Sequence, residues 1–235
     1  MNIDDNSTGR IVTRRKALAL LGGAAMLAGG APLRSGIAQA LPSCVVTPEQ
    51  MEGPFFTDVR LNRSDIRSDP TDKSVKEGVP LALTLRIAAI GVAGCTPLAG
   101  AMVDVWHCDA AGAYSDSDQS TAGRKFLRGH QVTDAGGAAR FTTIYPGWYP
   151  GRAVHIHFKV RIISGPALGH EFTSQLYFDE AVTDRVLARA PYSVRGQRTR
   201  NNGDGLFRRN GGRLLLALAE AGAGYAGEFH IGMKL

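Results

Sequence analysis

The chain has 235 residues, of which 44% are hydrophobic and 20% charged, and this ordinary balance favours a globular protein over a disordered one. The formal net charge is +6, but residues 1–40 carry five basic and two acidic side chains, which leaves about +3 on the remainder. Because no basic stripe with interleaved aromatic residues follows, the composition gives no support for a nucleic-acid partner.

The first 40 residues have the features of an export signal. Residues 13–16 (TRRK) resemble a twin-arginine motif, an apolar Gly/Ala-rich run follows over 17–31, and residues 38–40 form an A-x-A cleavage pattern. The apolar run of about 15 residues is short for a membrane span. We therefore expect a twin-arginine-type signal peptide over 1–40, with an ordinary secretory signal or an uncleaved anchor as alternatives. The mature chain would be periplasmic or extracellular, without stable membrane insertion after cleavage.

The chain contains three cysteines, Cys44, Cys95 and Cys108. An exported protein can form disulfides, but an odd number allows at most one internal bridge and leaves one thiol. The spacing contains no C-x-x-C motif and does not indicate which two cysteines pair.

Residues 41–235 show no internal repeat and are expected to form one domain. Residues 41–78 are rich in Pro, Asp and Arg and predict an irregular N-terminal arm. Period-2 patterns then predict strands, and the turn sequence TDAGG before residue 138 predicts a hairpin connection. The expected strands cover 81–88, 101–107, 138–145, 153–162, 172–178, 212–220 and 225–233, and 180–190 is the one clearly helical stretch. Many short strands with Gly and Asp turns predict an all-β sandwich or barrel with one short helix.

Residues 153–162 alternate with unusual regularity. Aliphatic and aromatic side chains occupy one face of the expected strand, and His155, His157, Lys159 and Arg161 occupy the other. The apolar face can therefore be buried while both histidines point the opposite way, where they are about 6–7 Å apart and can reach one metal ion. The remaining histidines lack this spacing and are interpreted as structural or surface groups: His107, His130, His170 and His230.

Two tyrosines extend this pattern. Tyr149 lies six residues before His155 in a loop bounded by Pro-Gly pairs, and Tyr114 follows an expected strand in a loop of small residues. A phenol has a pKa of about 10 and binds metal as a phenolate only beside a hard, highly charged cation. Two phenolates with two imidazoles favour Fe(III) over Zn(II) or Cu(I). The alternative is that both tyrosines are ordinary loop aromatics.

Several blocks of sequence resemble the intradiol ring-cleavage dioxygenases, which are non-haem Fe(III) enzymes that act on catechols. The blocks are EGPFF (52–56), CTPLAGAMVDVWHCDAAGAYSD (95–116), FLRGHQVTDAGG (126–137), PGWYPGRAVHIHFKV (146–160), SQLYFDE (174–180) and RGQRTRNNGDGLF (195–207). The ordered Y…Y-P-x-R-x-x-H-x-H pattern is far more specific than H-x-H alone.

The resemblance implies an immunoglobulin/prealbumin-like β-sandwich that cleaves a catechol with O2 to a muconate-type dicarboxylic acid. It assigns the iron to Tyr114, Tyr149, His155 and His157, with Tyr149 as the axial ligand that the substrate displaces and that accepts a substrate proton. Arg152 would stabilise the carbanion-like substrate, and Gln175 would assist in the same pocket.

The chain departs from the better-known members of this family. The short arm over 41–78 stands where the catechol-specific branch carries a helical dimerising segment. The complete ligand set makes a second chain type unnecessary, so the chain resembles the exported, single-domain branch. Catechol, hydroxyquinol and lignin-like catechols all remain open as substrates, as does a homo-oligomeric state.

Two other classes of function compete with this interpretation. A catalytically silent module of the transthyretin-like or carbohydrate-binding type would share the sandwich fold but would have no reason to retain four ligands. An oxygenase with a two-histidine, one-carboxylate iron site would need an acidic ligand, for which Asp104 or Asp109 could be proposed, and would leave Tyr149 without a role.

Overall fold

The structure is a computed structural model that describes residues 45–192 and 196–235. The predicted signal peptide and Cys44 lie outside these residues. Cys95 is disulfide-bonded, whereas Cys108 is a free and buried thiol. No helix in the described ranges combines the length and the apolar character that crossing a membrane requires.

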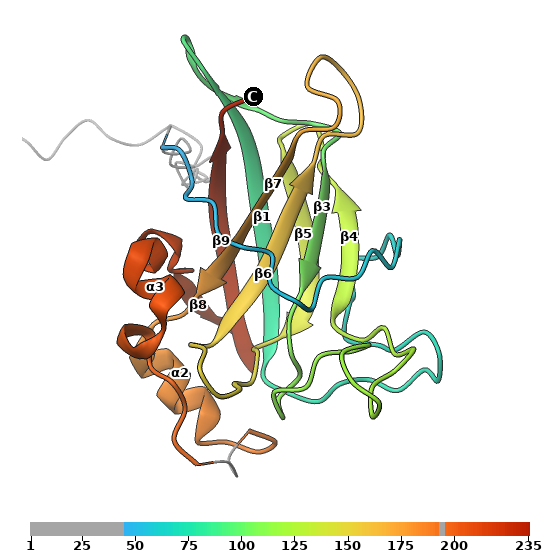
Figure 1. Cartoon of the computed structure of the whole chain (residues 1–235), viewed down its shortest axis with the longest axis vertical. Coiled ribbons are helices and arrows are strands. Elements are labelled where there is room, and N and C mark those ends of the chain that lie inside the picture. Colours follow the sequence, from blue (N-terminus) through green and yellow to red (C-terminus); the bar gives the residue numbers. More distant parts are fainter. Residues whose placement is uncertain (1–44, 193–195) are drawn as a thin grey trace, which may run out of the picture. The chain divides into compact units, whose positions relative to one another are not determined.

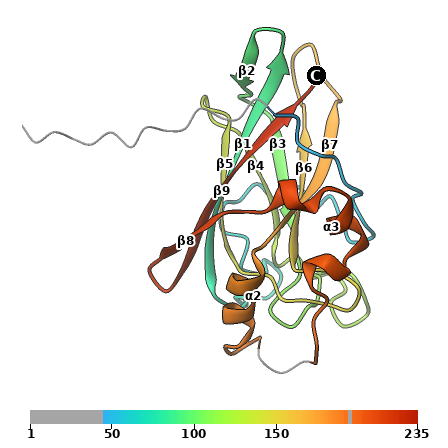
Figure 2. The same cartoon turned by 90° about the vertical axis from the view of Figure 1, so that its left-hand side faces the viewer.

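Two β-sheets face each other across the core, which confirms the predicted β-sandwich (Figure 1). One sheet has the order β2-β1-β9-β8, with β5 also paired to β1, and the other has the order β4-β3-β6-β7. Figure 2, turned by 90°, shows β1 and β9 in one layer and β6 and β7 in the other. The strands are β1 (Pro80–Gly91), β2 (Gly94–Pro97), β3 (Met102–Trp106), β4 (Arg128–Val132), β5 (Ala138–Ile144), β6 (His155–Arg161), β7 (Glu171–Tyr177), β8 (Leu218–Ala221) and β9 (Gly224–Met233).

The core lies where the predicted period-2 faces meet. Leu81, Leu83 and Leu85 of β1 and Ile156 and Phe158 of β6 are at most 1% exposed and belong to one cluster. Burying each such side chain stabilises the fold by roughly 1.5–3 kcal/mol, so the alternating pattern fixes which face of β6 turns inward.

Most predicted strands are confirmed within a few residues, but several expectations were wrong. The strand expected over 212–220 is a 3-10 turn (Gly211–Leu214) followed by β8, which begins only at Leu218. The helices are α2 (Glu180–Leu187), shorter than expected, and α3 (Gly205–Asn210), which was not expected. The short strands β2 and β4 were also missed.

The hairpin predicted at TDAGG was also wrong. The turn itself forms, because the Asp134 carboxylate accepts hydrogen bonds from the backbone amides of Gly136 and Ala138, each at 2.9 Å. The strands on its two sides, however, join different sheets: β4 pairs with β3, and β5 pairs with β1. The turn therefore carries the chain from one layer of the sandwich to the other.

The arm covers the histidine face of β6. Residues 45–79 form only isolated bridges, and Figure 1 shows the segment after residue 45 running across this sheet. Lys159 pairs with Glu52 of the arm, and Arg161 pairs with Asp58 at 3.1 Å. Both faces of β6 are consequently buried, so the histidines lie in a closed environment rather than on an open surface.

Candidate metal centre

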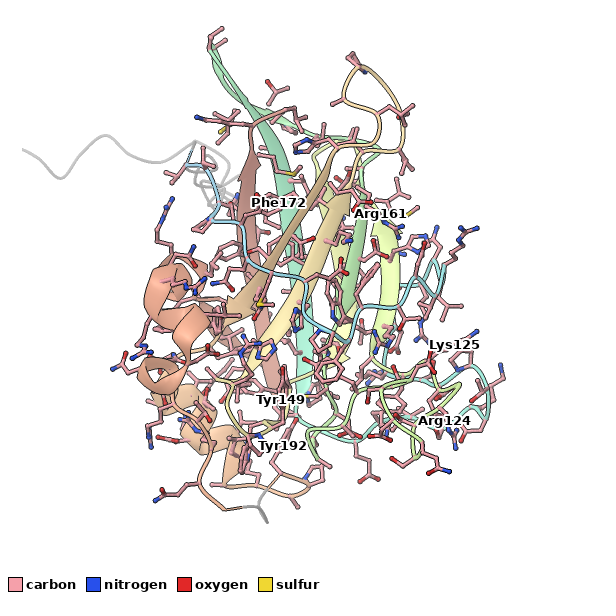
Figure 3. The ribbon with its side chains drawn as sticks, viewed as in Figure 1. Arg124, Lys125, Tyr149, Arg161, Phe172 and Tyr192 are labelled. Atoms are coloured by element: carbon pink, nitrogen blue, oxygen red, sulfur yellow. The ribbon has the colours of Figure 1, made fainter. Side chains whose placement is uncertain are left out.

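Strand β6 presents His155 and His157 on the face opposite the core. In the register of the sheet, Trp106 of β3 and Gln175 of β7 flank His157, and Tyr177 of β7 lies beside His155. Figure 3 shows Tyr149 near the start of β6 and Arg161 toward its other end. The centre is thus built at the end of the strand where the Tyr149 loop arrives.

The four residues predicted as ligands converge on one point. The Nε2 atom of His155 lies 3.3 Å from the Tyr114 Oη, 3.2 Å from the Tyr149 Oη and 3.0 Å from the His157 Nε2. Tyr149 lies in the loop just before β6, whereas Tyr114 comes from the distant loop between β3 and β4. The convergence is therefore a property of the tertiary structure and not only of the H-x-H spacing.

These separations suit ligands of a single ion. Donors that bind one first-row transition metal at about 2.0–2.1 Å, at angles of roughly 90–109°, are about 2.9–3.4 Å apart. The three distances from the His155 Nε2 fall within this range. The residues present therefore fit a metal ion held by two nitrogen and two oxygen donors.

The two imidazoles are oriented by different means. His155 donates from Nδ1 to the Ala153 carbonyl at 2.6 Å, which leaves the Nε2 lone pair directed at the cluster. His157 has no hydrogen-bond partner at Nδ1 among the described residues, and its ring stacks on Trp106 with centroids 4.9 Å apart. A hydrogen bond therefore fixes one ring, and aromatic packing fixes the other.

Burial keeps all four groups neutral when no cation is bound. It lowers the pKa of His155 to about 3 and that of His157 well below the usual range, with the nearby Arg152 and the second imidazole adding to the effect. Burial also raises the pKa of Tyr114 well above 10 and raises that of Tyr149, although Arg152 opposes the shift at Tyr149. Neutral imidazoles can bind a metal at neutral pH, whereas the phenols need a cation before they ionise.

The two tyrosines differ in their surroundings. Tyr114 is 2% exposed and stacks on Phe55 of the arm, with ring centroids 4.3 Å apart and planes 20° apart. Tyr149 is only partly buried, and the edge of the same Phe55 ring lies against it at 6.0 Å. One phenol is enclosed, and the other borders the outside of the centre.

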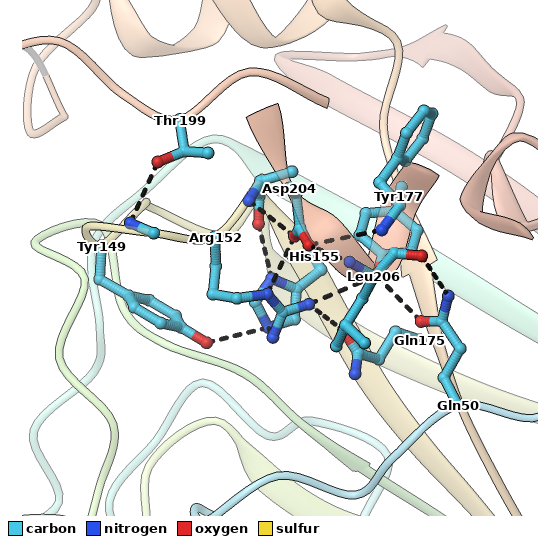
Figure 4. A network of polar contacts seen from close by, with 12 residues as sticks. Gln50, Tyr149, Arg152, His155, Gln175, Tyr177, Thr199, Asp204 and Leu206 are labelled. Atoms are coloured by element: carbon cyan, nitrogen blue, oxygen red, sulfur yellow. Dashed lines mark hydrogen bonds and ion pairs between the residues drawn. The ribbon is translucent and has the colours of Figure 1, made fainter. Parts of the chain in front are cut away.

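Arg152 lies beside the cluster, as the motif predicted (Figure 4). Its Nη1 is 3.5 Å from the His155 Nε2, its Nε donates to Asp204 at 2.9 Å, and its Nη2 donates to the Gln175 Oε1. Burial acts to lower the pKa of Arg152, but Tyr149 and Asp204 outweigh it, so the guanidinium stays charged. Gln175 is fully buried and donates from Nε2 to the Met51 carbonyl at 3.0 Å, which fixes its oxygen toward Arg152.

Sequence reasoning missed the residues that hold this network in place. The Tyr177 Oη donates to the Gln50 Oε1 at 2.9 Å and lies 3.2 Å from the Gln175 Oε1. Asp204 caps α3 and also accepts from the Ala153 amide at 3.0 Å. The alternation of β7 places Tyr177 on the face of Gln175, and Asp-Gly before an apolar pair is a helix-start signal, so both had a local signal. Gln50 had none.

The carboxylates that a two-histidine, one-carboxylate site would need are occupied elsewhere. Asp104 binds Arg161 at 2.8 Å, and Asp109 binds Lys76 at 2.8 Å. Within residues 45–192 and 196–235, no three His, Cys, Asp or Glu side chains are placed to hold a metal. The donor set that the structure does assemble includes the two phenols.

Comparison with known proteins gives a consistent set of relatives. A family profile described as dioxygenase matches residues 51–202. The β chain of protocatechuate 3,4-dioxygenase from Burkholderia cepacia is 33% identical over 150 residues, and catechol 1,2-dioxygenase 1 from Acinetobacter lwoffii is 30% identical over 148. These matches cover 52% and 54% of this chain but 62% and 45% of the two relatives, so the chain spans less than two thirds of either protein.

Solved structures match over a larger share of their length. An intradiol ring-cleavage dioxygenase from Tetranychus urticae superposes with a TM-score of 0.71 at 30% identity, over 81% of this chain and 95% of that one. The dioxygenase domain of a dioxygenase–carbohydrate-binding fusion from Streptomyces sp. SirexAA-E gives a TM-score of 0.61 at 31% identity, over 81% and 99%.

Proposed function

Because the chain belongs to the intradiol ring-cleavage dioxygenase family, we propose that it cleaves a catechol-type diol between its two hydroxylated carbons, using O2 and non-haem Fe(III). The product is a muconate-type dicarboxylic acid that contains both atoms of O2. One observation carries the proposal: the donor atoms of Tyr114, Tyr149, His155 and His157 converge at separations that suit a single ion.

Each residue contributes a distinct function to this centre. Bound Fe(III) supplies the charge that keeps the phenols ionised and makes a catecholate reactive toward O2. His155 and His157 provide neutral nitrogen donors, because burial lowers the pKa of both rings. Tyr114 provides an enclosed oxygen donor, which its surroundings keep in one place.

Tyr149 is the residue best placed to move a proton. Its side chain is partly exposed and lies on the loop just before β6, so its oxygen can move away from the cluster with little rearrangement. As substrate binds, the Tyr149 Oη accepts one of the two hydroxyl protons of the diol. The nearby Arg152 charge favours the phenolate form of Tyr149 before this transfer.

Arg152 stabilises the negative charge that develops on the substrate ring during oxygen attack. Asp204 and Gln175 hold the guanidinium from two sides, and Tyr177 contacts it at 3.3 Å. A fixed guanidinium can stabilise a developing charge without reorganising at the moment of reaction. Gln175 therefore acts by orienting Arg152.

Oxygen consumption and product analysis test the activity. The iron-loaded chain should consume one O2 per catechol and yield a dicarboxylic acid heavier than catechol by the mass of O2. His157→Ala, which removes a proposed ligand, is the matched negative. Release of hydrogen peroxide, or a yellow semialdehyde from cleavage beside the diol, would contradict the proposed reaction.

We also propose that residues 1–40 direct export through the twin-arginine route to the periplasm or the cell exterior. The Arg14-Arg15 pair supports this proposal. Cell fractionation of the full chain and of a variant with both residues changed to Lys tests it. Export that is indifferent to the double substitution would favour an ordinary secretory signal instead.

A further inference from the structure

Tyr114 lies in the long connection between β3 and β4, eight residues beyond the last residue of β3. No strand pairing fixes its backbone, yet its side chain is among the most buried at the centre. The loop must therefore be anchored by contacts of its own. Within the loop, the Ser117 hydroxyl donates to the Tyr114 carbonyl at 2.8 Å. Contacts from outside the loop converge on Ser115, the next residue in the chain.

Arg128, the first residue of β4, supplies those contacts. Its Nε donates to the Ser115 Oγ at 2.6 Å, and its Nη2 donates to the Ser115 carbonyl at 2.5 Å. The residue is 2% exposed, and the three acceptors of its guanidinium are carbonyl and hydroxyl oxygens and not a carboxylate. Burying a guanidinium that binds carbonyl and hydroxyl groups instead of a carboxylate costs desolvation free energy. This cost indicates that the buried position of Arg128 serves a purpose beyond packing.

The third contact of this guanidinium reaches the arm. Arg128 Nη1 donates to the Phe55 carbonyl, and the Phe55 ring stacks on the ring of Tyr114. Arg128 thus holds both the backbone beside Tyr114 and the aromatic ring that covers its phenol. Among the described residues, no arginine makes the corresponding pair of hydrogen bonds, one to Phe55 and one to the loop of Tyr149.

Backbone conformation marks the same contact. Asp116, which follows Ser115, and Leu127, which precedes Arg128, are both non-glycine residues at a φ of 53°. Such residues are strained in the left-handed region and persist only where their surroundings fix them. The strain therefore lies on both sides of the Ser115–Arg128 contact, within one residue of it.

We infer that Arg128 is a positioning residue for Tyr114, which ties the Tyr114 loop to the arm and thereby sets the position of the phenol in the metal centre. The inference rests on the proposed function of the centre. It predicts that disturbing Arg128 changes the bond between iron and Tyr114, and not only the stability of the fold.

The test compares Arg128→Lys with Arg86→Lys in the iron-loaded chain. Arg86 is the control, because it is a partly buried arginine of β1 in the other sheet, where its Nε binds Glu228 at 2.7 Å. We expect Arg128→Lys to displace the visible tyrosinate-to-iron band and to accelerate iron release to a chelator roughly 10–100-fold. Arg86→Lys should lower the melting temperature while leaving both readouts unchanged.

A second pair covers the case in which Arg128→Lys does not fold. Ser115→Ala removes one Arg128 contact, and Ser174→Ala removes a buried hydroxyl that donates to the Pro48 carbonyl at 2.7 Å. Ser115→Ala should shift the band in the same direction by a smaller amount. A wild-type band and release rate in Arg128→Lys or Ser115→Ala, or equal shifts in the controls, would overturn the inference. A wild-type chain that stays colourless with iron would instead overturn the proposed function.

Discussion

Tyr114 and Tyr149 offer the same chemical group to the centre but are enclosed to different degrees. Tyr114 is 2% exposed, stacks on Phe55 and lies in a loop that Arg128 binds at Ser115. Tyr149 is partly exposed, and its loop is held by hydrogen bonds on both sides, from the Gly147 amide to the Asp109 carbonyl at 3.1 Å and from the Gly151 amide to the Thr199 hydroxyl at 3.0 Å. In the proposed function, this difference makes Tyr114 the fixed ligand and Tyr149 the exchangeable one.

Removing the fixed phenol should have the largest effect. We expect Tyr114→Phe to lose most of its bound iron and to reduce turnover to background, because no other described oxygen replaces the Tyr114 Oη beside His155. Iron content after gel filtration measures the loss, and circular dichroism checks the fold. Full iron retention would show that Tyr114 is not the ligand that holds the iron in place.

Removing the exchangeable phenol should preserve more of the centre. Tyr149→Phe should retain iron, change the visible colour and lower turnover by about 10²–10⁴, because it deletes a proton acceptor as well as a ligand. Iron content and the visible spectrum, measured beside Tyr114→Phe, give the contrast. An unchanged colour would exclude Tyr149 from the metal shell, and equal iron loss in both variants would end the distinction between them.

The cation beside Tyr149 should matter for rate and not for iron. Arg152→Ala is expected to bind iron normally and to lower kcat by roughly 10²–10³, the cost of removing one preorganised charge. Arg200→Ala is the control, since this arginine is 60% exposed and pairs with Glu180 and Asp184. Normal turnover in Arg152→Ala would show that the guanidinium does not stabilise the reacting substrate.

Acid should weaken the support of the Tyr114 loop. His107, at its start, donates from Nδ1 to the Cys108 carbonyl at 2.8 Å and accepts from the Thr143 hydroxyl at 2.7 Å. Burial lowers the pKa of His107 to about 4, so below pH 6.5 the unfolded chain takes up a proton that the folded chain refuses. The free energy of unfolding should therefore fall by roughly 3 kcal/mol between pH 6.5 and pH 4 and then level off.

The comparison of His107→Gln with the wild type isolates this contribution. Chemical denaturation at several pH values should give stability curves that converge as the pH falls from 6.5 to 4. Curves that stay parallel across this window would show that His107 is not the group responsible. The ring nitrogens of His107 bond to Cys108 and Thr143, and neither residue belongs to the Tyr149 loop.

The sequence predicted those elements whose local pattern alone determines their structure, and it missed those that depend on tertiary contacts. Period-2 alternation identified β6 and its two faces, because burial of Ile156 and Phe158 dictates the register locally. β4 was missed because its buried residues include Arg128 and His130, which do not resemble a core strand. The turn at Asp134 was recognised, but local turn chemistry does not specify which sheet the next strand joins.

The residues of the metal centre also divide into those that the sequence predicted and those that it did not. The motif identified the four donors and Arg152, which lie close together in sequence apart from Tyr114. Gln50, which accepts from a tyrosine 127 residues away, and Arg128, which clamps Tyr114 through Ser115 and Phe55, depend on tertiary contacts. Such positioning residues become visible only when the chain is folded, because nothing in their immediate sequence distinguishes them.

The most direct measurement is the visible absorption spectrum of the iron-loaded chain, recorded without O2 before and after addition of catechol. The account predicts a red-brown tyrosinate-to-iron(III) band that moves to longer wavelength when catechol binds and the Tyr149 oxygen leaves the centre. A chain that remains colourless after ferric loading, or a band that catechol does not shift, would contradict the claim that these phenols and imidazoles form a substrate-binding iron centre.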